Sequence, residues 1–211
     1  MAGDLVSPPG FLVLDRLSQP SLQILARDTA VRADCQLENG RDLRLATCEF
    51  IRRKENLLSL GPPGVGKSHI ASGLGMKAAE NGFAVVFMNA DDLIETLRKD
   101  ETVDRRKIRR RRYMNASLLI VDELGFQALD RHDAHLFFKI ISQRYERGSI
   151  VITSNKSIRE WPDILAGDDV LTTAVLDRLL HHCHVIQMDG RSYRLKDIEL
   201  GLNERNEKSN C

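Results

Sequence analysis

The sequence has few of the features that mark disulfide-stabilised, metal-binding or membrane proteins. Its four cysteines form no C-x-x-C pair, so their spacing indicates neither a zinc site nor a disulfide framework. No apolar run approaches the roughly 18 residues that a membrane-spanning helix requires. Pro8-Pro9 interrupts the N-terminal stretch where a signal peptide would have its apolar core. These absences predict a cytoplasmic protein in a reducing compartment, with no membrane partner.

A strong charge of one sign is also missing. Lys and Arg number 31 against 30 Asp and Glu, which leaves a formal net charge of +1. The whole molecule therefore has no field that would draw it to nucleic acid, and any such attraction must come from a local patch. A length of 211 residues with 42% hydrophobic and 29% charged residues is typical of a globular protein with one sizeable core.

The most informative stretch is G-P-P-G-V-G-K-S, from Gly61 to Ser68. It matches the phosphate-binding pattern G-x-x-x-x-G-K-[ST] in full. The short apolar run at 56–60 before it predicts a buried parallel strand. The stretch at 68–80 after it has apolar residues at every fourth position and predicts a helix. A loop between a strand and a helix is the context that this motif requires.

The residue types in this loop suit the binding of ATP with Mg²⁺. Glycines allow backbone torsions that let successive N–H groups point at phosphate oxygens, near the positive end of the following helix. The Lys67 ammonium is placed to reach the β- and γ-phosphates, and the Ser68 hydroxyl to ligate Mg²⁺. The predicted nucleotide-binding residues are Gly61, Pro62, Pro63, Gly64, Val65, Gly66, Lys67, Ser68 and His69.

Further apolar runs alternate with helical patterns along the chain. After the first strand at 56–60, four more are expected at 83–88, 117–123, 149–153 and 184–188, and 11–14 is a candidate for a further short strand. Helices are expected at 21–32, 41–54, 91–99, 132–147 and 172–180, with an irregular stretch at 163–170. This alternation predicts an α/β fold of the P-loop NTPase type, with a five-stranded, mostly parallel sheet and helices on both faces. Ligands bind at the carboxyl ends of such strands.

Polar residues follow two of the expected strands. Asp122 ends an apolar strand and is expected to hold Mg²⁺ together with Ser68. Glu123 stands beside it and is expected to orient or deprotonate the attacking water. Asn155 follows the next strand and is a candidate to contact the γ-phosphate or that water. The alternative is that all three residues, Asp122, Glu123 and Asn155, simply leave a strand and enter a turn.

One segment is strongly basic. Seven of the eight residues from 105 to 112 are positively charged, and they make this run the best candidate for contacting duplex DNA. Only Tyr113 could stack on a base, so contacts to the phosphate backbone are expected rather than sequence readout. The alternative is a solvated charged loop. The predicted DNA-binding residues are Arg105, Arg106, Lys107, Arg109, Arg110, Arg111 and Arg112.

A resemblance to a known family runs from about residue 42 to 197. The phosphate loop, the strand ending in Asp122-Glu123, and above all A-V-L-D-R-L-L-H-H-C-H-V-I from Ala174 followed by G-R-S-Y-R-L resemble the IstB family. IstB-like proteins are AAA+ ATPase helpers of insertion-sequence transposases and are related to the helicase loader DnaC. The resemblance explains the histidines at 181–184 without a metal ion.

The resemblance implies further roles and partners. Asn155 matches the sensor 1 residue, Arg178 the arginine finger that acts in a neighbouring subunit, and Arg194 the position of sensor 2. It implies a homo-oligomer on duplex DNA that hydrolyses ATP and activates or targets a transposase. A helicase loader of the DnaC type and a non-hydrolysing, DNA-binding assembly switch remain alternatives. Without the resemblance, Arg178 would be read as a surface arginine paired with Asp177.

The two ends of the chain fit the family less well. Residues 1–41 do not resemble the helical N-terminal segment of IstB-like proteins, so we expect an atypical segment there. Residues 42–197 are expected to form the ATPase domain, and 198–211 a polar tail. Because the sequence ends soon after Arg194, the lid domain is expected to be short or absent, and a truncated gene copy is an alternative.

Overall fold

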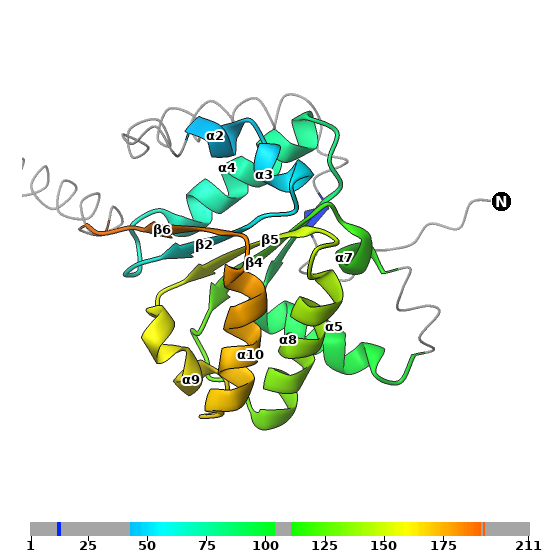
Figure 1. Ribbon diagram of the computed structural model, residues 1–211, viewed down its shortest axis with the longest axis vertical. Helices are drawn as coiled ribbons and strands as arrows, with labels where there is room; N and C mark the ends of the chain where they lie inside the picture. The colour runs from blue at the N-terminus through cyan, green and yellow to red at the C-terminus, as the bar shows by residue number, and fades with distance from the viewer. Residues whose placement is uncertain (1–11, 14–42, 104–110, 191, 193–211) are drawn as a thin grey trace, which may run out of the picture.

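A six-stranded sheet forms the centre of the molecule (Figure 1). The computed structural model describes residues 12–13, 43–103, 111–190 and 192. The strand order is β1-β3-β4-β5-β2-β6. The five parallel strands are β2 (Asn56–Leu60), β3 (Val85–Asn89), β4 (Leu118–Leu124), β5 (Ser149–Ser154) and β6 (Cys183–Gln187). The two-residue strand β1 (Leu12–Val13) pairs antiparallel with β3 at the edge.

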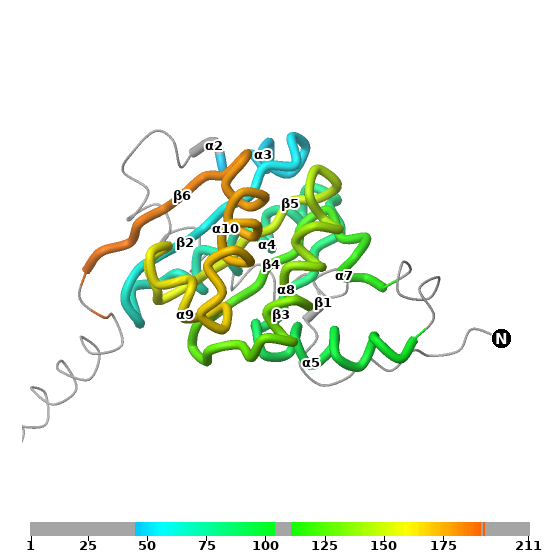
Figure 2. Tube along the Cα trace, turned by 60° about the horizontal axis from the view of Figure 1, so that its bottom comes forward, coloured from blue at the N-terminus to red at the C-terminus, as the bar shows by residue number. Residues whose placement is uncertain are grey.

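Helices cover both faces of the sheet, as Figures 1 and 2 show. One face carries α2 (Leu43–Ala46), α3 (Glu49–Arg52) and α4 (Lys67–Glu80). The other carries α5 (Ala90–Asp100), α8 (Arg131–Arg144) and α10 (Asp169–Leu180), with α8 and α10 side by side. Two four-residue helices, α7 (Arg112–Asn115) and α9 (Trp161–Ile164), complete this second layer. No helix in the described part of the chain is long and apolar enough to cross a membrane.

The alternation of side chains along each strand produces two cores. Leu58, Leu119 and Ile152 belong to the cluster that packs against α5, α8 and α10. Their sequence neighbours Leu57 and Leu118 belong to the cluster on the α4 side. Because successive strand residues point to opposite faces, a run that is apolar throughout needs cover on both sides. The predicted α/β fold with five parallel strands is therefore confirmed.

The expected single helix at 41–54 is wrong. The chain forms α2 and α3 instead, because Cys48 between them adopts the left-handed conformation with φ 58°. This break turns Leu45, Cys48 and Ile51 into the core, while Ala46 and Thr47 are exposed.

Other element bounds differ from expectation by smaller amounts. The second expected strand begins at Val85 rather than at residue 83, and the helix after it is capped by Asn89, whose side chain accepts the N–H of Ala90. The stretch at 163–170 is not irregular throughout, because α9 ends at Ile164 and α10 begins at Asp169. The expected helix at 21–32 lies outside the described residues.

Candidate functional site

The phosphate loop lies between β2 and α4, as the sequence predicts. Gly64 and Gly66 have φ angles of 82° and 102°, which lie in the left-handed region where other residues are strained. The space above the loop is also tight. A Cβ atom on Gly64 would lie 2.1 Å from Ser192 Oγ, and one on Gly61 would lie 2.1 Å from the Met188 carbonyl oxygen. Met188 and Ser192, which follow β6 in the sequence, therefore lie against the loop.

The start of α4 is built to receive an anion. Gly66 is the N-cap of α4 and supplies no side-chain acceptor to the first N–H groups of the helix. Lys67 is 9% exposed, and its ammonium donates hydrogen bonds to the carbonyl oxygens of Gly61 and Pro62, each at 2.7 Å. A buried cation and uncapped N–H groups at one place fit a phosphate group. Ser68, half-buried in the first turn, adds a hydroxyl there.

Thr153 connects the two carboxylates at the end of β4. Its hydroxyl donates a short hydrogen bond to Asp122 and accepts the backbone N–H of Glu123 at 2.9 Å. Asp122 is 8% exposed, so this bond satisfies part of a nearly buried carboxylate. The strands β4 and β5 are thereby fixed to each other where the predicted Mg²⁺ ligand lies. Thr153 lies inside an apolar strand, and no sequence motif marks it for this role.

A break in the β4–β5 ladder sets the direction of Glu123. The pairing shifts between Val121 and Leu124, and Glu123 has a φ of 60°. A bulge of this kind breaks the alternation by which successive strand side chains point to opposite faces of the sheet. Non-glycine residues with a positive φ are strained and concentrate at functional sites. The exposed Glu123 carboxylate accepts a hydrogen bond of 3.3 Å from the Asn89 side-chain amide.

Asn89 is a site residue that the sequence analysis missed. It directly follows the predicted second strand at 83–88. The parallel register places Asn89 beside Asp122 across the β3–β4 pair. The signal was the same one that singled out Asn155, namely a polar residue at the carboxyl end of a strand.

The fold brings the predicted site to one edge of the sheet. β5 lies between β4 and β2, and Ser154 at its end accepts the Gly61 N–H at 3.2 Å and donates to the Leu124 carbonyl at 2.7 Å. Asn155 follows, exposed, at the same edge. The predicted meeting of the phosphate loop, Asp122-Glu123 and Asn155 is thus confirmed as a placement, whereas their chemical roles stay predictions.

Arg178 lies away from this edge. It is in the last turn of α10, next to Leu179, whose carbonyl accepts the side-chain amide of Asn56 at 3.0 Å. Asn56 begins β2, and the phosphate loop follows the other end of that strand. Arg178 itself donates to the Ala174 carbonyl at 2.8 Å, and its guanidinium lies 4.8 Å from the centre of the Phe138 ring. Arg178 therefore does not join the phosphate loop of its own chain.

Only the end of the basic run is described. Arg112 is exposed, whereas Arg111 is ion-paired with the buried Asp100, its Nη2 2.7 Å from Oδ1. The other predicted DNA-binding residues lie outside the described residues; they are Arg105, Arg106, Lys107, Arg109 and Arg110. Arg194 also lies outside the described residues.

The histidine-rich stretch has ordinary partners. His181 Nδ1 is hydrogen-bonded to the Tyr145 hydroxyl at 2.7 Å, and His184 Nε2 to Glu55 at 2.7 Å. Within the described ranges, no group of three His, Cys, Asp or Glu side chains could hold a metal ion. Burial raises the pKa of the Cys183 thiol to about 12, so this thiol stays protonated and unreactive at neutral pH.

Sequence comparisons identify relatives of this chain. The profile of the family described as IstB-like ATP binding protein matches residues 26–200. The inferred ATP-binding protein of insertion sequence IS5376 from Geobacillus stearothermophilus is 44% identical, over 80% of this chain and 66% of its own length. That of IS21 from Pseudomonas aeruginosa is 46% identical, over 72% of this chain and 57% of its own. The chain thus spans roughly three fifths of the curated relatives it matches.

Solved structures share the fold at low sequence identity. AMPPCP-bound DnaA from Aquifex aeolicus is 21% identical with a TM-score of 0.56, over 80% of this chain and 53% of that one. The DnaC helicase loader is 22% identical with a TM-score of 0.55, over 72% of this chain and 91% of that one. These likenesses confirm the predicted α/β fold of the P-loop type.

Proposed function

The chain belongs to the family of IstB-like ATP-binding proteins, and on that premise we propose that it is a cytoplasmic, Mg²⁺-dependent ATPase that helps DNA transposition. It assembles on duplex DNA and activates or targets a transposase. The insertion-sequence origin of the relatives supports the context. We assign the activity to residues 42–197 and leave 1–41 and 198–211 outside the ATPase domain.

One observation carries the proposal: the carboxyl ends of β2, β4 and β5 lie side by side, so the phosphate loop, Asp122-Glu123 and Asn155 are at one edge of the sheet. Lys67 and the first N–H groups of α4 bind the phosphate groups, and Ser68 and Asp122 supply oxygen ligands for Mg²⁺. Glu123, turned outward by the bulge, accepts a proton from the attacking water. Asn155, exposed at the same edge, orients that water.

The arginine of the site comes from a neighbouring subunit in this proposal. Arg178 and the phosphate loop lie beyond opposite ends of β2, so one subunit can present Arg178 to the next in a head-to-tail assembly. Its spread positive charge stabilises the transferring phosphoryl group, an effect worth about 10³- to 10⁵-fold in rate in related chemistry. Hydrolysis thereby depends on assembly.

The basic run provides the DNA contact in this proposal. Seven positive charges in eight residues release counterions when they meet phosphates, so affinity should fall steeply as the salt concentration rises. Exposed Arg112 marks the described end of this surface.

Nucleotide binding is the first test of the proposal. The Lys67→Ala variant should lose most of its affinity for a fluorescent ATP analogue with Mg²⁺, because the buried cation of the loop is removed. Lys77→Ala is the matched control, since Lys77 lies on the same helix but is exposed and pairs with Glu80 at the surface. Equal affinity of the two variants would contradict the nucleotide site.

The partner separates the proposal from its main alternative. The tagged protein should retain a transposase encoded by an insertion sequence in the presence of DNA and ATP. Retention of a replicative helicase instead would identify a loader of the DnaC type and overturn the transposition role.

A further inference from the structure

A buried carboxylate joins the two flanks of the basic run. Asp100 is the last residue of α5 and is 3% exposed. One of its oxygens receives Arg111 at 2.7 Å and the other the Tyr113 hydroxyl at 2.8 Å. We call these three residues, Asp100, Arg111 and Tyr113, the clasp. Asp100, which precedes the run from 105 to 112 in the sequence, therefore contacts Arg111 within the run and Tyr113 just after it.

Tyr113 is the buried and well-packed member of the clasp. Tyr113 is 1% exposed, and burial, together with its bond to Asp100, raises its pKa above the ordinary value, so the hydroxyl stays a donor. The Tyr113 carbonyl in turn accepts a hydrogen bond of 2.7 Å from the buried Arg144 of α8. Arg111, in contrast, keeps 48% of its side chain exposed. Solvent and ligands can reach Arg111 but not Asp100.

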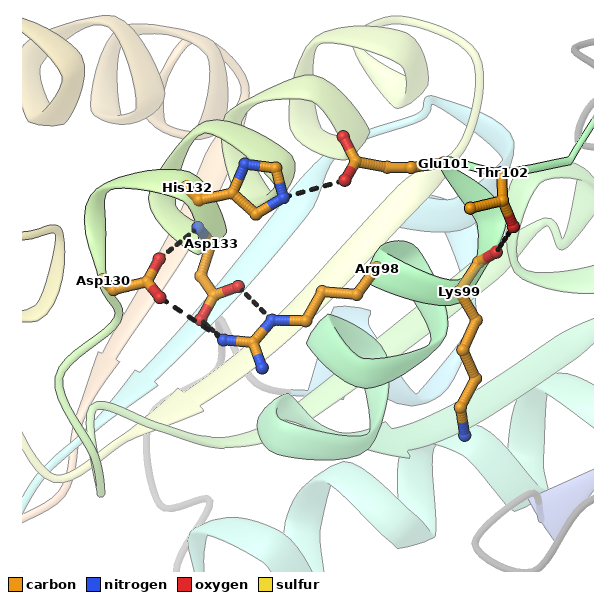
Figure 3. A network of polar contacts seen from close by, with 7 residues as sticks. All are labelled: Arg98, Lys99, Glu101, Thr102, Asp130, His132 and Asp133. Carbon is orange, nitrogen blue, oxygen red and sulfur yellow. Dashed lines mark hydrogen bonds and ion pairs between the residues drawn. The ribbon is translucent and has the colours of Figure 1, made fainter.

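The same helix reaches the catalytic carboxylate at its other end. Asn89 caps the start of α5 and donates to Glu123. At 1.5 Å per residue, the 11 residues of α5 separate Asn89 from the clasp by about 16 Å. Arg98 in the last turn binds Asp133 with two hydrogen bonds and holds α5 against α8 (Figure 3). One short helix thus connects the basic run to Glu123.

Arg111 has two possible anionic partners when DNA is present. A DNA phosphate competes for its exposed guanidinium with the carboxylate of Asp100. If the phosphate wins, the Tyr113 hydroxyl is the side-chain partner that Asp100 retains among the described residues. A buried carboxylate without its cation is strongly unfavourable. The end of α5 must then readjust, and Asn89 moves with the helix that it caps.

We propose that Asp100 is a positioning residue that couples DNA contact at Arg111 to the orientation of Glu123 through α5. The proposal rests on the proposed function, because it concerns DNA-stimulated hydrolysis at the same site. It predicts that removal of the Asp100 charge leaves DNA binding intact but reduces the stimulation of ATP turnover by DNA.

The test uses Asp100→Asn in the full chain, with steady-state ATP turnover measured with and without a random-sequence DNA duplex. Binding of the same duplex is measured over a series of salt concentrations. Glu95→Gln is the matched control, since it removes one negative charge from α5 at an exposed pair with Lys99, away from the clasp. Tyr113→Phe removes only the hydroxyl and serves as the second variant if Asp100→Asn does not fold.

Asp100→Asn should keep its basal turnover within about twofold of wild type, and DNA should stimulate it less than about one fifth as much. Its DNA affinity should not fall, and the salt dependence should be at least as steep, since Arg111 is no longer neutralised. Tyr113→Phe should lose part of the stimulation, and Glu95→Gln none.

Three results overturn the coupling role. If Asp100→Asn is stimulated like wild type, the clasp does not transmit the signal. If it loses DNA binding and stimulation together, the clasp only shapes the DNA-binding surface. If DNA does not stimulate even the wild type, the proposed DNA-coupled ATPase fails as well, which distinguishes the two failures.

Discussion

At the scale of single residues, one hydroxyl organises the acidic end of β4. Thr153 donates to Asp122 and accepts from the Glu123 backbone, so a change at Thr153 reaches both carboxylates at once. Asp122 is nearly buried, and a buried carboxylate without its donor is destabilised. Thr153 therefore positions the predicted metal ligand and the predicted base without being expected to touch either the metal or the water.

Replacement of Thr153 by Val tests this role, because it keeps the shape and removes the hydroxyl. Turnover should fall about tenfold, while nucleotide affinity changes less, since the phosphate loop is untouched. Thr172→Val is the control, because Thr172 is also buried but lies in α10, where its hydroxyl donates to the Asp168 carbonyl. Wild-type turnover by Thr153→Val would contradict the assignment.

The phosphate loop was predictable at this scale, and Thr153 and Asn89 were not. All eight loop residues are contiguous, so their pattern can be read directly from the sequence. Thr153 and Asn89 act only through the register of β3, β4 and β5, which pairs residues about 30 positions apart. The bulge at Glu123 has no local signal, because a glutamate rarely adopts a positive φ.

At the scale of elements, Arg144 holds three chain segments together. This arginine is 1% exposed and donates to the carbonyl oxygens of Tyr113, Met114, Ala116 and Ser149. It thereby joins the end of α8 to α7 and to the start of β5. Burial lowers the pKa of Arg144 to about 10, so the guanidinium remains charged at neutral pH. The hydrogen bonds to these carbonyls offset the cost of burying that charge.

Arg144→Met should lower the free energy of unfolding by about 3 kcal/mol, because several buried carbonyls lose their donor at once. Urea titration followed by circular dichroism measures the change. Arg147→Met provides the comparison, since Arg147 is exposed three residues later. The account of Arg144 is wrong if the two variants unfold at the same urea concentration.

Element types were predictable from periodicity, and some bounds were not. The apolar strands and α4 have patterns that tertiary packing reinforces. The helix expected at 41–54 failed because Cys48 takes a left-handed conformation that glycine or asparagine would have signalled. Packing of the Cys48 side chain, which is fully buried, decided the local conformation against the helical periodicity.

At the scale of the whole molecule, the arrangement divides one proposed site between two subunits. The phosphate loop, Glu123 and Asn155 lie at one edge of the sheet, and Arg178 lies toward the other. A repeated head-to-tail contact can join the two edges, and such heterologous interfaces build rings or helical filaments. The sequence reveals Arg178 only through the family resemblance, because its own surroundings are those of a surface arginine.

A mixing experiment tests the shared site. Glu123→Gln and Arg178→Ala should each be inactive alone, and an equal mixture should recover about a quarter of the wild-type turnover. In random head-to-tail pairing, half of the sites keep Glu123 and half of those meet an intact Arg178. Mixing either variant with the double variant is the control. No recovery in the first mixture would contradict action in trans.

The central claim is that this molecule couples ATP hydrolysis to DNA, and steady-state ATP turnover with and without duplex DNA tests it most directly. DNA should raise the turnover of the wild type, and Glu123→Gln should lower it at least about 100-fold while nucleotide binding persists. Absence of turnover in a wild type that still binds nucleotide through Lys67 would contradict the claim. It would identify instead a non-hydrolysing assembly switch.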